Sequence, residues 1–179
     1  MKKENKTVYA YIDGSNLHKG IEELGWKLDY FRFKKWLEEK YKVSKAYIFI
    51  GLVQEHKRIY TYLQEAGFTL IFKETIPGKD GDIKGNCDAE MVLKSVSDCY
   101  EIKYDNAILV TGDGDFACLA SFLHEKQKLR TIIAPNFKKS SYLIRKIQVP
   151  LVFMNNLKNK LKQNEKAPET DKTATGSSS

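Results

Sequence analysis

Short apolar runs alternate along the chain with longer segments whose apolar residues recur at helical spacing. The apolar runs, rich in β-branched and aromatic residues, predict strands at residues 7–12, 45–53, 68–73, 106–110, 129–134 and, at a sheet edge, 150–153. The helical spacing predicts longer helices at 30–41, 55–66, 88–102 and 115–126, with a short helix or loop at 17–24 and a short helix after residue 140. This alternation predicts a three-layer α/β/α sandwich around a mostly parallel central sheet of about five strands.

The composition divides the chain into three parts. Residues 1–6 form a basic N-terminal extension, residues 7–157 one domain, and residues 158–179 a polar tail rich in Lys, Asn, Glu, Thr and Ser. With 179 residues, of which 42% are hydrophobic, the chain is long enough for one domain with a sizeable core. We expect the tail to be disordered because it has too few apolar residues to build a core.

The sequence predicts a protein of a reducing compartment that does not associate with a membrane. No apolar run approaches the ~20 residues of a membrane span, and the basic N-terminus leads into a strand rather than into the apolar core of a signal peptide. Cys87, Cys99 and Cys118 lie in apolar helical segments and form no close pair, which favours buried thiols over disulfides or metal ligands. We therefore expect a cytoplasmic protein.

The net charge is basic but modest. It is +7 at pH 7, with +2 in residues 1–6 and +2 in residues 155–179, which leaves +3 for the body of the chain. A balance of this kind permits contact with nucleic acid without requiring it.

Acidic residues follow several of the expected strands. The apolar run at 108–110 leads into Thr-Gly-Asp-Gly-Asp at 111–115, where the glycines allow a tight turn, and the first strand leads into Asp-Gly-Ser-Asn at 13–16. Another aspartate opens the helix that follows the third strand. Right-handed crossovers bring the ends of parallel strands and the starts of the following helices to one edge of the sheet. We therefore expect four carboxylates to share one cleft: Asp13, Asp88, Asp113 and Asp115.

Such a cluster requires either raised pKa values or a cation. At ~4 Å and an effective dielectric constant of ~20, each pair of like charges costs about 4 kcal/mol. The short acids, with Asn16, Ser15 and Thr111 nearby, are hard oxygen donors that suit Mg²⁺ or Mn²⁺ rather than zinc. Each acid alone would be an ordinary turn or helix cap, but their common edge favours a metal site that activates water and neutralises phosphoryl charge.

Several segments resemble the signature segments of the NYN domain family, in its LabA-like branch of the PIN-like nuclease superfamily. These are Tyr11–Leu17, Lys84–Leu93 and Leu109–Phe116, and Ser140-Ser141-Tyr-Leu resembles the start of the family's last helix. The resemblance spans roughly residues 7–155. It implies a PIN-like fold, a divalent-metal site at the four aspartates with Asn16 in support, and hydrolysis of RNA that leaves a 5′-phosphate.

One position departs from the family pattern. Many members have an acid about two turns into the helix that begins at Asp88, where this chain has Lys94. If that acid is needed for a second ion, the chain holds one metal ion, or binds the second only with substrate. Glu90 and Asp98 are near in sequence but do not lie at that position.

The candidate substrate contacts are basic and polar residues around the same edge. Lys84, in the long loop at 74–86, is placed to meet a phosphate, and Asn16, Ser15 and Thr111 are further candidates. Phosphate contacts without sequence selectivity are also expected from basic side chains outside the cleft, where a solvated surface is the alternative: Lys79, Lys138, Lys139, Arg145 and Lys146.

The leading hypothesis is a metal-dependent ribonuclease that acts on single-stranded RNA, with homo-oligomerisation left open. A second hypothesis is a non-catalytic module that keeps the cleft and binds RNA or a protein partner, and Lys94 is its main support. A third hypothesis, a phosphatase or phosphotransferase, is disfavoured. The first strand ends in Asp-Gly-Ser-Asn, without a second Asp two residues on to serve as acid and base.

Overall fold

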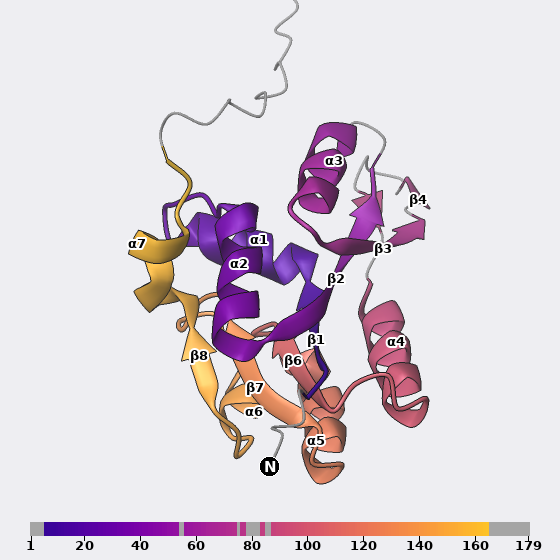
Figure 1. Cartoon of the computed structure of the whole chain (residues 1–179). Coiled ribbons are helices and arrows are strands. Elements are labelled where there is room, and N and C mark those ends of the chain that lie inside the picture. The colour runs from indigo at the N-terminus through magenta and orange to yellow at the C-terminus, as the bar shows by residue number, and fades with distance from the viewer. Residues whose placement is uncertain (1–5, 54–55, 75, 78–82, 85–86, 165–179) are drawn as a thin grey trace, which may run out of the picture.

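The computed structural model describes residues 6–53, 56–74, 76–77, 83–84 and 87–164 (Figure 1). Its strands are β1 (Val8–Asp13), β2 (Val43–Leu52), β3 (Thr69–Glu74), β4 (Ile76–Pro77), β5 (Ile83–Lys84), β6 (Asn106–Val110), β7 (Leu129–Ala134) and β8 (Leu151–Phe153). Its helices are α1 (Gly14–Glu23), α2 (Tyr30–Tyr41), α3 (Lys57–Glu65), α4 (Asp88–Tyr100), α5 (Ala117–Glu125), α6 (Tyr142–Arg145) and α7 (Lys158–Leu161), with single 3₁₀ turns η2 (Gly114–Phe116) and η3 (Met154–Leu157).

The central sheet of the described chain has six parallel strands in the order β3-β2-β1-β6-β7-β8. This confirms the α/β sandwich, and the expected edge strand near residue 150 is the sixth member, paired with β7. The strand order runs outward in one direction from β1 and in the other direction from β6. In open α/β sheets, ligands bind where the order reverses, outside the carboxyl ends of the strands.

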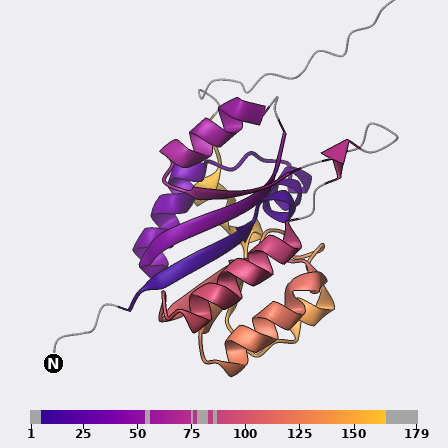
Figure 2. The same ribbon diagram turned by 90° about the vertical axis from the view of Figure 1, so that its right-hand side faces the viewer.

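Helices cover both faces of the sheet (Figures 1 and 2). The core on one face contains side chains of α1, α2, α3 and α7, and the core on the other face contains those of α4, α5 and α6. Because successive residues of a strand point to opposite faces, Ala10 and Ile12 of β1 enter the first core and Tyr11 enters the second. Because β1 is packed into both cores, its carboxyl end is held in a defined position.

The ordered domain extends past its expected end at residue 157. Lys158–Leu161 form α7, and the side chain of Leu161 is 1% exposed in the first core. The Leu161 carbonyl accepts a hydrogen bond from the Asp29 N–H (2.8 Å), and the Gln163 N–H donates to the Lys27 carbonyl (2.8 Å). Residues 158–164, expected to belong to the disordered tail, are thus ordered with the domain, while residues 1–5 and 165–179 lie outside the described residues.

The cysteines only partly follow expectation. All three are free, but only Cys99 is buried, whereas Cys87 is half-buried and Cys118 is exposed. Cys118 follows the Asp115 turn at the start of α5, on the side of the helix that faces away from the core. The expectation of a buried thiol was therefore wrong for Cys118, because the apolar composition of a helix does not by itself identify its outer side.

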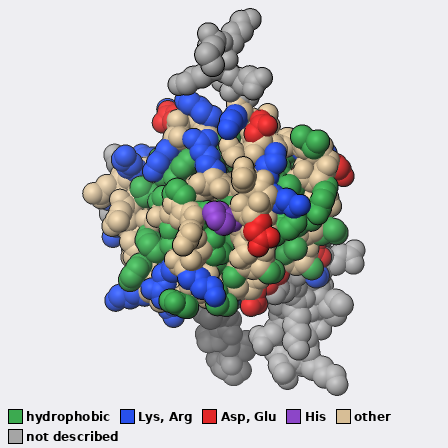
Figure 3. All heavy atoms as spheres, turned by 90° about the horizontal axis from the view of Figure 1, so that it is seen from below, with side chains coloured by type: hydrophobic (Ala, Val, Ile, Leu, Met, Phe, Trp, Pro, Cys, Tyr) green, Lys and Arg blue, Asp and Glu red, His purple; other side chains and the backbone are tan. Residues whose placement is uncertain are grey.

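The face at the amino ends of the strands has a mixed surface. Lys and Arg are scattered among Asp, Glu and hydrophobic side chains in Figure 3, without a broad area of one charge. Among the described residues, no helix has the length and apolar character needed to cross a bilayer. The residues singled out as a site lie at the opposite end of the strands.

Candidate active site

Asp13 lies at the junction of β1 and α1, beside the point where the strand order reverses. Its carboxylate caps α1 by accepting the Asn16 N–H (3.0 Å), and it also accepts the Thr111 hydroxyl (3.3 Å) from the neighbouring strand end. The chain turns closely against β2 here, because a Cβ on Gly14 would lie only 2.7 Å from the carbonyl oxygen of Phe49. The Gly after the acid is thus needed for the helix to begin directly at the end of β1.

The turn after β6 holds Asp113 by backbone hydrogen bonds. The Asp113 N–H donates to the Thr111 hydroxyl oxygen (3.1 Å), and one Asp113 carboxylate oxygen accepts the Asp115 N–H (3.1 Å). The Gly112 N–H donates to the Asn16 side-chain oxygen (2.9 Å), which ties α1 to this turn. Asn16 therefore fixes the two acidic strand ends relative to each other.

The charges of Asp88 and Asp113 act on the carboxylate of Asp13. Burial, followed by the charges of Asp88 and Asp113, raises the pKa of Asp13 from 3.8 to about 6, although hydrogen bonds from the Asn16 N–H and the Thr111 hydroxyl act in the opposite direction. Asp88 is the first residue of α4. Asp115 is the next acid of the turn, but it is exposed, and its N–H donates to the Asp113 carboxylate.

The raised pKa of Asp13 predicts a pH-dependent cost to stability in metal-free protein. Between the unfolded value of 3.8 and the folded value of about 6, the folded chain keeps a proton that the unfolded chain has released. The contribution of Asp13 to the free energy of unfolding should therefore fall by up to about 3 kcal/mol as the pH rises from 4 to 7.

Urea unfolding with chelator at pH 4 and pH 7 measures this effect. Asp13→Asn keeps a capping oxygen and should be more stable than the native chain at pH 7 but not at pH 4. Asp29→Asn is the matched control. Asp29 caps α2 by accepting the Arg32 N–H at 3.1 Å, and it lies outside the acidic cluster. A native-minus-variant difference for Asp13→Asn that does not change with pH would contradict the prediction.

The donor set fits a hydrated hard cation rather than a closed metal cage. Among the described residues, no three His, Cys, Asp or Glu side chains form a group arranged to hold a metal ion. Mg²⁺ is often held by one or two carboxylates and keeps several waters, so it does not require such a group. Burial raises the pKa of the neighbouring Cys87 thiol to about 11, so the thiol is protonated at neutral pH in the metal-free protein. A cation would offset the repulsion that acts on Asp13.

Lys94 belongs to a different buried network. Its ammonium group lies 2.6 Å from one oxygen of Asp98 and 5.0 Å from the centre of the Tyr47 ring. Asp98 is fully buried, and its other oxygen accepts the Tyr11 hydroxyl (2.9 Å). Glu90 instead pairs with Lys73 at 3.2 Å. The charge of Lys94 is therefore compensated within α4, and neither nearby acid replaces the one that the family pattern has at this position.

The remaining predicted contacts are placed unevenly. Thr111 is buried between the two acidic strand ends, and Ser15 is exposed in the first turn of α1. Lys84 lies in the β5 strand of a short hairpin, but its side chain is outside the described residues, as is the whole of Lys79.

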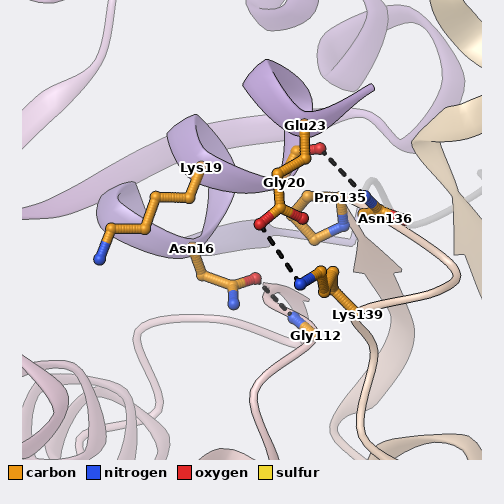
Figure 4. A pocket seen from close by; sticks show the side chains of 8 residues that line it. All are labelled: Asn16, Lys19, Gly20, Glu23, Gly112, Pro135, Asn136 and Lys139. Carbon is orange, nitrogen blue, oxygen red and sulfur yellow. Dashed lines mark hydrogen bonds and ion pairs between the residues drawn. The ribbon is translucent and has the colours of Figure 1, made fainter. Parts of the chain in front are cut away.

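A pocket beside the acidic cluster was not predicted from the sequence. It has a volume of about 160 Å³ and lies between α1, the turn after β6 and the segment after β7, lined by Asn16, Lys19, Gly20, Glu23, Gly112, Pro135, Asn136 and Lys139 (Figure 4). Lys139 pairs with Glu23 across it (3.6 Å). A Cβ on Gly20 would lie 2.6 Å from the Pro135 side chain, so the close approach of α1 depends on this glycine. Residues 16, 19, 20 and 23 are spaced by three or four positions, so the sequence could have shown that they share one face of α1.

Comparison with known proteins places this chain among relatives of similar fold. Residues 7–151 match the family model of the NYN domain. The chain is similar to low amplitude and bright protein LabA of Synechococcus elongatus, with 26% identity over 134 residues that cover 69% of this chain and 71% of LabA. A crystal structure of a protein of unknown function from Vibrio parahaemolyticus has the same fold, with a TM-score of 0.75, 21% identity, and coverage of 90% of this chain and 99% of that one.

Proposed function

The chain belongs to the NYN domain family, which is generally nuclease-like, and on this premise we propose that it is a divalent-metal-dependent ribonuclease. The similarity to LabA agrees with the LabA-like branch. The observation that carries the proposal is the meeting of Asp13 and the Asp113 turn at the point where the strand order reverses, where the Thr111 hydroxyl contacts both. Burial, followed by the charges of Asp88 and Asp113, raises the pKa of Asp13 to about 6. A buried carboxylate surrounded by like charge favours a cation.

The proposed site uses the carboxylates of Asp13, Asp88 and Asp113 to hold Mg²⁺ or Mn²⁺, with Asp115 at its exposed side. The bound metal would supply an activated water and neutralise charge on the phosphoryl oxygen. Thr111 donates to Asp13 and accepts from the Asp113 N–H, so one hydroxyl orients both acids. Asn16 holds the turn in place through the Gly112 N–H.

The proposed substrate is RNA. Lys19 and Lys139 in the adjoining pocket, with Ser15 and Lys84, are the candidate contacts to its phosphates. The free cysteines suit the reducing cytoplasm that we propose as its location.

Incubation of purified protein with a labelled single-stranded RNA tests the activity. We expect cleavage with Mn²⁺ or Mg²⁺, loss of cleavage with excess chelator, recovery when the metal is added back, and products that end in a 5′-phosphate. The metal dependence follows from the acidic donor set. Cleavage at an unchanged rate in chelator would contradict the proposal.

A second candidate function is an RNA-binding module without turnover. One observation favours it: Lys94, which pairs with Asp98, occupies the position where many family members have an acid. Under this alternative, RNA and Mn²⁺ would both bind, measured by anisotropy and calorimetry, while the RNA stayed intact over long incubation.

A further inference from the structure

The segment that leads from β7 to β8 presents aromatic and basic side chains beside the acidic cluster. Residues 126–164 contain no Asp or Glu. Within this stretch, Tyr142 is 70% exposed and Phe137 is 49% exposed, although both are large rings. We name the α6 surface by its exposed residues: Phe137, Lys138, Tyr142, Leu143, Arg145 and Lys146.

The α6 surface is attached directly to the turn that carries Asp113. The Ser141 N–H donates to the Gly112 carbonyl (2.8 Å), and the Ser141 hydroxyl caps α6 by accepting the Leu143 N–H (3.2 Å). Gly114 approaches so closely that a Cβ there would lie 2.6 Å from the Ser141 hydroxyl oxygen. Tyr142 is therefore the residue next to a fixed contact with the acidic turn.

The exposed rings stand on a rigid base. Ile144 of α6 is 1% exposed and packs into the second core. The Phe137 ring packs edge-to-face on Phe153 (4.9 Å between ring centres), and the Phe137 N–H donates to the Asn155 side chain (2.9 Å). The Arg145 guanidinium lies over the Phe137 ring at 5.5 Å. A base stacked beside Phe137 and Arg145 would thus meet side chains that are already ordered, which lowers the entropic cost of binding.

The charges of the α6 surface are available for phosphates. Within the described residues, Lys138, Arg145 and Lys146 have no carboxylate partner, whereas Lys139 pairs with Glu23. Sequence-tolerant binding of single strands combines aromatic side chains that stack on bases with cations that follow the backbone. A duplex keeps its bases stacked inside and cannot use such a platform.

We propose that Tyr142 is a base-stacking residue, and that the α6 surface binds unpaired RNA that leads into the acidic cluster. This inference rests on the proposed function, because it assigns the substrate class of the same site. Tyr142 takes one base on its ring, Phe137 and Arg145 offer a second stacking position, and Lys138 and Lys146 take the neighbouring phosphates. Tyr142 is a binding residue here and not a catalytic one.

Binding of a short fluorescent oligouridylate RNA in chelator tests the proposal without cleavage. Tyr142→Ala should weaken binding by about 5- to 150-fold, the range of one lost base stack. Tyr142→Phe should bind as the native chain does, because it keeps the ring. Tyr100→Ala is the matched control, since Tyr100 is 67% exposed on α4, away from the acidic turn, and its loss should leave binding unchanged.

An abasic oligonucleotide of the same length separates stacking from other effects. The native chain and Tyr142→Ala should bind it equally, whereas Lys138→Gln should weaken binding of both ligands. Equal binding of oligouridylate by the native chain and Tyr142→Ala would overturn the proposal, as would an equal loss on the abasic strand. Unchanged RNA binding together with Tyr142-dependent self-association would assign the surface to a protein contact instead.

The cleavage assay keeps this proposal distinct from the proposed function. Tyr142-dependent binding without any cleavage would support RNA binding by the α6 surface and contradict the proposed nuclease activity. If the native chain and Tyr142→Ala cleaved limiting RNA equally well, the nuclease proposal would stand and RNA binding by Tyr142 would be contradicted.

Discussion

Replacing Asp113 with asparagine is expected to reduce metal-dependent RNA cleavage by at least about 100-fold, the equivalent of several kcal/mol of transition-state stabilisation. The substitution removes one of the charges that act on Asp13 and would weaken the proposed metal site. The asparagine oxygen can still accept the Asp115 N–H, so the turn should survive. The loss of cleavage would then come from the missing charge and not from misfolding.

Asp105→Asn is the matched control for this experiment. Asp105 precedes β6, at the opposite end of the strand from Asp113, and its carboxylate also accepts a backbone N–H, that of Thr7 (2.7 Å). This variant should cleave RNA like the native chain, and thermal unfolding should show that both variants fold. Retention of cleavage by purified Asp113→Asn would remove Asp113 from the site.

Asp113→Asn should also show whether Mn²⁺ binds at the acidic cluster. Mn²⁺ is expected to raise the Tm of the native chain, because a ligand that binds only the folded state stabilises it. The shift should be smaller in Asp113→Asn and unchanged in Asp105→Asn. An equal Mn²⁺ shift in all three proteins would place the metal elsewhere.

The sheet could be predicted because its strands are buried on both faces and read as continuous apolar runs. The limits of β6 and β7 agree with the expected residues 106–110 and 129–134. The caps of α2 and α6 were recognisable from side chains that favour helix starts: Asp29 for α2, and Ser140 or Ser141 for α6, where the structure has Ser141. The α7 helix was missed because it is only four residues long and its stability comes from packing of Leu161 against distant residues.

The acidic edge could be predicted from topology, but the contacts of Lys94 and the exposure of Tyr142 could not. Parallel strands with right-handed crossovers place Asp13 and Asp113 at one edge of the sheet, as the alternation of strands and helices predicts. The structure adds that β1 and β6 are paired neighbours. The role of Lys94 depends on Tyr11 and Tyr47, which come from two other strands and leave no local signal in α4. The exposure of Tyr142 likewise depends on how a four-residue helix docks on the acidic turn.

Removal of the Asp98 carboxylate should cause a large loss of stability. Asp98 is fully buried, its two oxygens receive the Tyr11 hydroxyl and the Lys94 ammonium group, and Lys103 lies 3.4 Å away. Burial and the hydrogen bond to Asp98 raise the pKa of Tyr11, so its hydroxyl remains a donor that needs an acceptor. Asp98→Ala should lower the free energy of unfolding by about 3–5 kcal/mol, as when one partner of a buried ion pair is removed.

Urea unfolding of a small variant series can assign this loss to the network. Tyr11→Phe removes one hydrogen bond and should cost only about 1–2 kcal/mol, whereas Asp98→Leu combined with Lys94→Met should recover much of the stability lost in Asp98→Ala, because no charge is left without a partner. Glu39→Ala breaks the exposed Lys35–Glu39 pair (3.8 Å) and should change stability little. If Asp98→Ala were as mild as Glu39→Ala, the carboxylate could not be holding Tyr11 and Lys94 together, and Lys94 would be free to act at the acidic edge.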